Sequence, residues 1–246
     1  MVKVDSASQL GLRCVAQQIA KAGYHLRDAS TAAAPLDSGV AQERSSLEVR
    51  WVIQGHMQAA VAGWFARFPL EVESREDLYL LHPRLRTFSV KIRGARALEV
   101  KVYRGSPGVI DMPGRALGRM EFWRKWSWPC DQLGGDSGTV PAGSTLPPGW
   151  TPVHKQRRLS RFPLAADRGP DGAVTEPGVS VELTKIHGPG GPWWSLGFEA
   201  TGPDDLLRRQ LEATAARVFA EPLPGGLAFS PDDSCSYAEW LRRQVP

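Results

Sequence analysis

Apolar and polar residues alternate along much of the chain, a pattern that is typical of β-strands. In residues 47–53 the odd-numbered positions are apolar, whereas Glu48 and Arg50 lie on the opposite face. A hairpin is predicted over 88–93 and 97–103, because two alternating segments are joined by a short connection. The remaining expected strands span residues 77–81, 120–127, 153–159, 179–186 and 193–200. The pattern therefore predicts about eight strands, mostly antiparallel.

Three segments have helical spacing instead. Apolar residues recur at helical intervals over 57–68 until Pro69, and again over 204–219, where Asp204 and Asp205 favour the N-terminus. Ser236 and Glu239 have the spacing of a capping box before a last short helix. Because strands and helices do not alternate as βαβ units, the expected fold class is α+β, with helices flanking a mostly antiparallel sheet.

The chain divides into a leader and one larger domain. Residues 1–45 end in a small, polar, proline-interrupted stretch and are expected to form a flexible leader; one short helix within it is the alternative. Residues 46–246 are expected to form a single domain. Within it, residues 129–150 hold five Gly and four Pro without alternation, which predicts a long mobile loop.

The amino-acid composition and the net charge argue against several classes of protein. The chain has 246 residues, of which 42% are hydrophobic, with nine Trp and a net charge of +4. Such a chain can build a core, and it lacks the apolar run of about 20 residues that a membrane helix needs. The net charge does not indicate specific nucleic-acid binding. The three cysteines (Cys14, Cys130 and Cys235) have no metal-binding spacing and, with no signal peptide, predict free thiols in the cytoplasm.

Charged residues occupy the polar face of nearly every expected strand. Seven are basic and five acidic: Arg50, Lys91, Arg93, Lys101, Lys125, Lys155 and Arg157, with Glu48, Glu99, Glu121, Glu182 and Glu199. On an open sheet they would form a solvated face with cross-strand pairs worth roughly 0.2–1 kcal/mol each. In a closed barrel they would point inward, where buried charges require water, ions or an ionic ligand. The alternation alone leaves both interpretations open.

Other sequence motifs for metal binding, nucleotide binding or nucleophilic catalysis are weak. The five histidines are dispersed and lack zinc-binding spacing. The glycine clusters at 134–135 and 188–191 match neither a P-loop nor a dinucleotide-binding motif, and no serine lies in a nucleophile elbow. Tryptophans such as Trp123 and Trp193 could stack on bases, but core packing is the commoner role.

The order of the charged motifs resembles that of a known family. Glu48-x-Arg50 is followed by Lys-x-Arg at 91–93, Glu-x-Lys at 99–101, Lys-x-Arg at 155–157, and single glutamates at 182 and 199. Asp77 and Tyr79 lie in a segment similar to the D-x-Y strand of the same family. Over about residues 46–219 this order is similar to that of the CYTH, or triphosphate tunnel metalloenzyme, family.

This resemblance implies an antiparallel eight-stranded, tunnel-like β-barrel that binds a triphosphate or another organic phosphate in a charged lumen, usually with Mg²⁺ or Mn²⁺. The phosphate-binding residues would be Arg50, Lys91, Arg93, Lys101, Lys125, Lys155 and Arg157. The metal ligands would be Glu48, Glu182 and Glu199. The resemblance assigns no catalytic residue.

The sequence departs from the family pattern on the acidic side. Arg50 stands where a second glutamate is usual, and Thr184 and Ala200 stand where further carboxylates are common. Three functions therefore remain open: a metal-dependent triphosphatase, a non-catalytic phosphate- or polyanion-binding module, and a structural or interaction protein. The expected partner is an anionic small molecule, such as a polyphosphate or a nucleotide, rather than a membrane or a specific nucleic acid.

Overall fold

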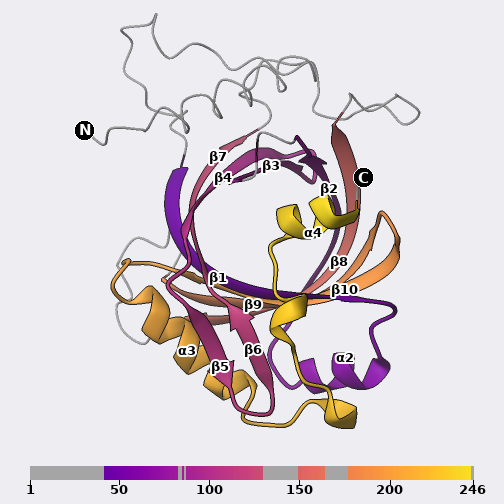
Figure 1. Ribbon diagram of the computed structural model, residues 1–246, viewed down its shortest axis with the longest axis vertical. Helices are drawn as coiled ribbons and strands as arrows, with labels where there is room; N and C mark the ends of the chain where they lie inside the picture. Colours follow the sequence, from indigo (N-terminus) through magenta and orange to yellow (C-terminus); the bar gives the residue numbers. More distant parts are fainter. Residues whose placement is uncertain (1–41, 83–84, 86, 130–148, 164–176, 245–246) are drawn as a thin grey trace, which may run out of the picture. The chain divides into compact units, whose positions relative to one another are not determined.

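Eight strands form a closed antiparallel β-barrel, as the resemblance implies (Figure 1). The computed structural model describes residues 42–82, 85, 87–129, 149–163 and 177–244. In the barrel the strands are hydrogen-bonded in the order β1-β10-β9-β8-β2-β3-β4-β7. Their bounds are β1 (Gln42–Gln54), β2 (Glu71–Leu80), β3 (Phe88–Arg93), β4 (Ala97–Gly105), β7 (Glu121–Pro129), β8 (Trp150–Pro163), β9 (Gly178–Gly188) and β10 (Gly191–Thr201).

All eight expected strands are present, with altered ends. β1 begins at Gln42, inside the predicted leader, and β8 begins at Trp150, at the end of the predicted loop. The rest of the leader, residues 1–41, and residues 130–148 of the loop lie outside the described residues. Cys14 and Cys130 lie there too, whereas Cys235 is a free, buried thiol as predicted.

A second, two-stranded sheet was not predicted. It consists of β5 (Val109–Met112) and β6 (Ala116–Arg119). The strands have four residues each, too few for alternation to identify them, and the surrounding glycines and prolines suggest loops. Between them Gly114 has φ of +68° in the turn that Arg115 N–H closes on Met112 O at 2.8 Å, a conformation that suits glycine.

The helices lie where their periodicity predicts them. They are α2 (Ala59–Phe65), α3 (Leu207–Val218) and α4 (Tyr237–Gln244), with short 3₁₀ turns η2 (Pro224–Gly226) and η3 (Pro231–Asp233). The capping-box prediction at α4 is half confirmed, since the Glu239 N–H donates to Ser236 Oγ at 3.3 Å. Among the helices of the described residues, none has the length and apolar character that a membrane crossing requires.

The described chain forms two compact units. Unit 1 contains the described residues of Glu76–Val102 and Lys125–Val153, together with those of β1 up to Glu43. Unit 2 contains the described residues of Arg44–Arg75, Tyr103–Arg124 and His154–Pro246. The core of unit 1 is an apolar cluster that includes Val90, Ile92, Leu98, Val100 and Trp150. That residues 46–246 fold as a single domain stays a prediction.

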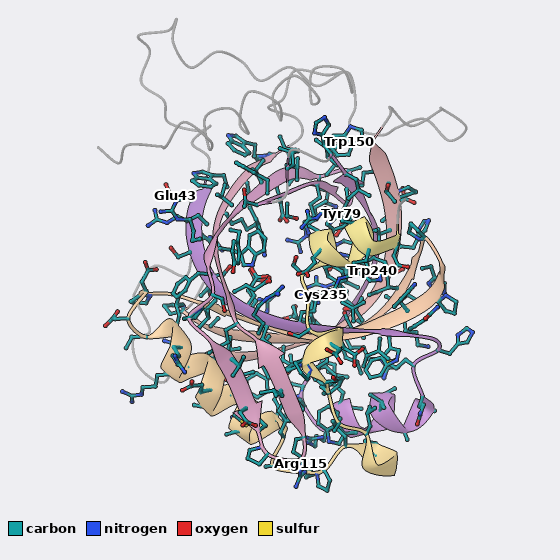
Figure 2. All side chains as sticks on the ribbon, in the orientation of Figure 1. Glu43, Tyr79, Arg115, Trp150, Cys235 and Trp240 are labelled. Atoms are coloured by element: carbon teal, nitrogen blue, oxygen red, sulfur yellow. The ribbon has the colours of Figure 1, made fainter. Side chains whose placement is uncertain are left out.

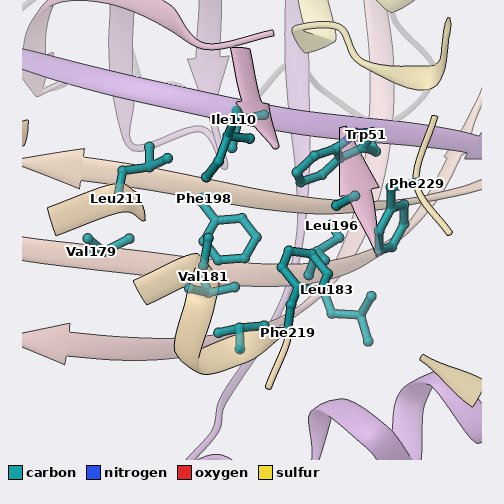
Figure 3. Close-up of a cluster of buried hydrophobic side chains, with 14 of the residues drawn as sticks. Trp51, Ile110, Val179, Val181, Leu183, Leu196, Phe198, Leu211, Phe219 and Phe229 are labelled. Carbon is teal, nitrogen blue, oxygen red and sulfur yellow. The ribbon is translucent and has the colours of Figure 1, made fainter. Parts of the chain in front are cut away.

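The core of unit 2 lies between the apolar faces of β1, β9 and β10 and the elements that cover them. Figure 3 shows Trp51 among the aromatic residues of this core. The Trp51 ring centroid lies 6.3 Å from that of Phe198, 6.2 Å from Phe219 and 5.2 Å from Phe229. Its indole N–H donates to Leu117 O at 2.9 Å and so ties β1 to the β5–β6 hairpin. One face of these strands is thereby covered by α3 and the hairpin.

Candidate functional site

The charged face of the strands is largely withdrawn from solvent. None of the twelve charged residues singled out in the sequence is exposed. Lys155, Glu99, Glu121 and Glu182 are buried and the other eight are half-buried. The solvated outer face, one of the two interpretations left open by the sequence, is therefore wrong. In unit 2, α3 and the hairpin cover the apolar face (Figure 1), so the charged face turns toward the inside of the closed barrel.

Strand register places Arg50 and Glu182 in one row across β1, β10 and β9. Arg50 pairs with Gly197 of β10, and Gly197 pairs with Glu182 of β9. Since Gly197 has no side chain, the guanidinium of Arg50 crosses over it, and Arg50 Nη1 donates to Glu182 Oε1 at 2.5 Å. A Cβ at Gly197 would lie only 2.7 Å from Arg50 Cζ. Glycine at this position is therefore what lets the side chain of β1 reach β9.

Glu182 is held by a second arginine from the other side. Arg157 of β8 donates from both Nε and Nη2 to Glu182 Oε2, at 2.8 and 2.5 Å, and from Nη1 to Glu73 of β2 at 2.8 Å. Burial by itself would raise the pKa of Glu182, but Arg50, Arg157 and Lys155 outweigh it and hold that pKa well below its usual range. Glu182 is thus a buried carboxylate that stays charged.

The first turn of α4 covers these cations. The Tyr237 ring centroid lies 3.7 Å from Lys155 Nζ and 4.2 Å from Arg50 Cζ, and its hydroxyl is 2.8 Å from Ser195 Oγ. Both ring contacts have cation–π geometry. We call Arg50, Lys155 and Arg157, with Glu182 and Tyr237, the capped cluster.

Other contacts fix α4 over the capped cluster. Trp240, labelled on α4 in Figure 2, is buried, and its ring centroid lies 5.6 Å from that of Trp193 on β10. Glu239 receives hydrogen bonds from Arg119 of β6 and, at 2.7 Å, from Arg243. Arg119 also donates to Glu121 Oε1, from Nη2 at 2.8 Å. The helix is therefore held by both apolar and ionic contacts.

Unit 1 contains a second charged group, which we call the lysine cluster: Lys91, Arg93, Lys125, Asp77 and Glu99. Glu99 of β4 lies at its centre, 2.8 Å from Lys125 Nζ, 3.1 Å from Lys91 Nζ and 3.4 Å from Arg93 Nη1. Lys91 also lies 3.3 Å from the fully buried Asp77. Burial alone would raise the pKa of Glu99, but Lys91, Lys125 and Arg93 outweigh it and lower that pKa.

The expected metal ligands do not assemble. Glu48 and Glu199 are directly opposite each other on β1 and β10, and Glu48 accepts a hydrogen bond from Ser46 Oγ at 2.7 Å. Glu182, the third expected ligand, has both oxygens bound by arginines. Within the part of the chain that is described, no group of three His, Cys, Asp or Glu side chains could hold a metal ion. The donor set therefore does not fit the Mg²⁺ or Mn²⁺ site that the resemblance implies.

The structure thus places six of the seven predicted phosphate-binding residues in two groups. Arg50, Lys155 and Arg157 belong to the capped cluster, and Lys91, Arg93 and Lys125 belong to the lysine cluster. Lys101 lies half-buried on β4, opposite Ser89 of β3.

Sequence reasoning missed several members of these groups. Glu73 precedes the predicted strand, and Gly197 carries no side chain that a pattern of charges could detect. Tyr237 lies far from the charged strands in sequence, and only its place in the capping-box segment gave a signal. Only the register and the contacts of α4 bring these residues to the arginines.

Comparisons with known proteins find solved structures that are similar in fold but low in sequence identity. No protein-family model matches the chain, and no curated protein does. The PH1819 protein of Pyrococcus horikoshii OT3 is similar with a TM-score of 0.41 and 16% identity, over 81% of this chain and 99% of that one.

Two eukaryotic structures are similar at the same level. One is the putative adenylyl cyclase HpAC1 of Hippeastrum, described with a dominant triphosphatase activity (TM-score 0.40, 13% identity, 81% of this chain and 95% of that one). The other is the Pct1 RNA triphosphatase of S. pombe, in complex with the Spt5 CTD (TM-score 0.35, 10% identity, 89% of each chain). Likeness of this degree carries no argument about activity, so what the site can do follows from its own residues.

Proposed function

We propose that the protein binds a triphosphate or another organic phosphate at the capped cluster of unit 2. The observation that carries the proposal is the convergence of three basic side chains, all largely withdrawn from water, on one polar face. Arg50 and Arg157 both bind the buried carboxylate of Glu182, and Lys155 lies close enough to help lower its pKa. Buried cations gathered on one face present charged donors to an anion, and phosphate oxygens are strong acceptors for such donors.

The geometry of the cations suits phosphate oxygens. Guanidinium groups match phosphate with parallel N–H donors, and an ammonium group adds a compact point charge. Arg157 is held on both sides by Glu73 and Glu182 and so has a fixed orientation. Because Arg157 is already oriented, its side chain loses little entropy when a ligand binds.

Tyr237 would have to leave for a phosphate to reach these cations. Its ring lies directly on Lys155 and Arg50, the same two side chains that would face the ligand. A phosphate group offers these cations full negative charges in place of a ring quadrupole, which is a stronger interaction. We therefore expect ligand binding to displace the first turn of α4.

Hydrolysis of the bound phosphate is a separate question. A metal-dependent triphosphatase needs a divalent cation to polarise the phosphoryl group and orient water. The engagement of Glu182 by two arginines favours the alternative, a binding module without a metal-dependent reaction. Release of inorganic phosphate from tripolyphosphate or ATP, in the presence of Mg²⁺ or Mn²⁺, distinguishes the two.

Calorimetric titration with tripolyphosphate tests the binding itself. Lys155→Met keeps the length of the side chain and removes its charge, so we expect the affinity to fall about tenfold or more, as for a lost charge-assisted hydrogen bond. Lys185→Gln is the matched control, because Lys185 is an exposed lysine on β9; its affinity should equal that of the unmodified protein. No binding to the unmodified protein, or equal losses in both variants, would refute the proposal.

A further inference from the structure

In the capped cluster, the guanidinium of Arg50 binds the carboxylate of Glu182 that a divalent cation would otherwise use as a ligand. We infer that the guanidinium of Arg50 takes the place of a divalent cation, so that the phosphate-rich ligand binds without Mg²⁺ or Mn²⁺. This inference rests on the proposed function. It follows from three features of Arg50: the carboxylate that it binds, the N–H donors that remain for a ligand, and its fixed position and charge.

The first feature is the carboxylate. A metal at this face would need the lone pairs of Glu182, because hard divalent cations are bound through carboxylate oxygens. Those oxygens are already used, Oε1 by Arg50 and Oε2 by Arg157. The positive charge that neutralises Glu182 is therefore supplied by side chains of the protein.

The second feature is the donor capacity that remains. A guanidinium has five N–H donors. Among the described residues, every hydrogen bond of the Arg50 side chain comes from Nη1, to Glu182 and, at 3.4 Å, to Ser195 Oγ. Nε and Nη2 can therefore donate to an anion. A bound Mg²⁺ would bridge a carboxylate and a phosphate, and Arg50 can make the same bridge with hydrogen bonds.

The third feature is that Arg50 is fixed and permanently charged. Its guanidinium packs against Gly197, where an added Cβ would lie 2.7 Å away, and its hydrogen bond to Glu182 of β9 holds it there. Burial would lower the pKa of Arg50, but Glu182, Tyr237 and Glu48 outweigh it and raise that pKa. Unlike a metal ion, this cation cannot dissociate from the site.

Two measurements on the full chain test the inference. In the first, tripolyphosphate is titrated by calorimetry into protein in excess EDTA. We expect the unmodified protein to bind, and Arg50→Gln to bind about ten- to a hundredfold more weakly, as for lost hydrogen bonds to a charged group. Gly197→Ala, which forces the guanidinium away without changing any charge, should also weaken binding.

In the second measurement, Mn²⁺ is titrated and followed by electron paramagnetic resonance. The unmodified protein should not bind Mn²⁺ at this site. Arg50→Glu removes the guanidinium and adds a carboxylate beside Glu182 and Glu48, so it should acquire a Mn²⁺ site. Lys185→Glu, with the same change of charge on the exposed surface of β9, is the control and should not.

The outcomes separate the two claims. If tripolyphosphate binds only with Mg²⁺ or Mn²⁺ added, the proposed function stands and the inference fails. If tripolyphosphate binds under no condition, the proposed function fails, and the Mn²⁺ titration then decides the role of Arg50. A Mn²⁺ site in the unmodified protein that is lost in Glu182→Gln would overturn the inference. A Mn²⁺ site that appears only in Arg50→Glu would support it.

Discussion

At the scale of single residues, Glu99 in unit 1 and Glu182 in unit 2 have the same kind of surroundings. Each is a buried carboxylate that contacts more than one cation. Such arrangements add little net stability when intact, but removing one partner is costly, since the remaining charges stay buried without compensation. The two carboxylates therefore hold their clusters together through charge rather than through packing.

Glu99→Gln should lower the free energy of unfolding at neutral pH by about 3–5 kcal/mol, because Lys91 and Lys125 lose their shared anion. Urea unfolding followed by tryptophan fluorescence measures this change. Glu76→Gln, at an exposed carboxylate of the same unit, is the control and should have an effect near zero. Similar losses in both variants would contradict the central position of Glu99.

The same carboxylate makes stability depend on pH. The pKa of Glu99 is lowered in the folded chain, so the unfolded chain binds more protons under acid conditions. Stability is then fully present above the unfolded pKa of about 4.3 and is lost as the pH falls below it. In Glu99→Gln this part of the acid dependence should disappear. Unfolding free energies measured from pH 6 downward, with an unchanged slope in the variant, would contradict the assignment.

At the scale of elements, the β5–β6 hairpin depends on close contact with β1. Gly118 of β6 lies against the fully buried ring of Trp51, where an added Cβ would be 2.5 Å from Cζ2 of the indole and 2.8 Å from Cγ2 of Val49. Neither neighbour can move easily, because Trp51 is surrounded by Phe198, Phe219 and Phe229. The glycine therefore sets how near the hairpin approaches the sheet.

Gly118→Ala should destabilise the protein by about 1–3 kcal/mol, the usual cost of overpacking a filled core. Thermal unfolding followed by circular dichroism measures the effect. Gly63→Ala, in the helix α2 where an added Cβ meets nothing within 4 Å, is the control and should be neutral or slightly stabilising. A neutral Gly118→Ala would show that the hairpin can shift away from Trp51.

The sequence pattern predicted some of the secondary-structure elements and their contacts, but not all of them. Alternation identified every barrel strand, because each has one apolar face over at least part of its length. It could not identify β5 and β6, whose four residues are too few for a period. It also could not reveal that Gly197 opens a path for Arg50, since that depends on the register of three strands. The helix α4 was predicted, but its contact with the cations depends on tertiary packing.

At the scale of the whole molecule, a net charge of +4 conceals an uneven distribution. The basic side chains lie on the polar face of the strands, and Glu182, an expected metal ligand, neutralises two of them instead. The seven basic residues predicted to bind phosphate all lie on this face. The predicted metal site is the part of the sequence interpretation that does not fit, because the placement of Arg50 changes the role of Glu182.

The central claim is that a phosphate-rich anion binds to the cations of the capped cluster. Its most direct test is a crystal structure of the full chain grown with tripolyphosphate and EDTA. The account predicts phosphate oxygens within hydrogen-bond distance of Arg50 and Lys155, with the Tyr237 ring displaced from both. Tripolyphosphate bound only elsewhere, with Tyr237 still in contact with Lys155, would contradict it.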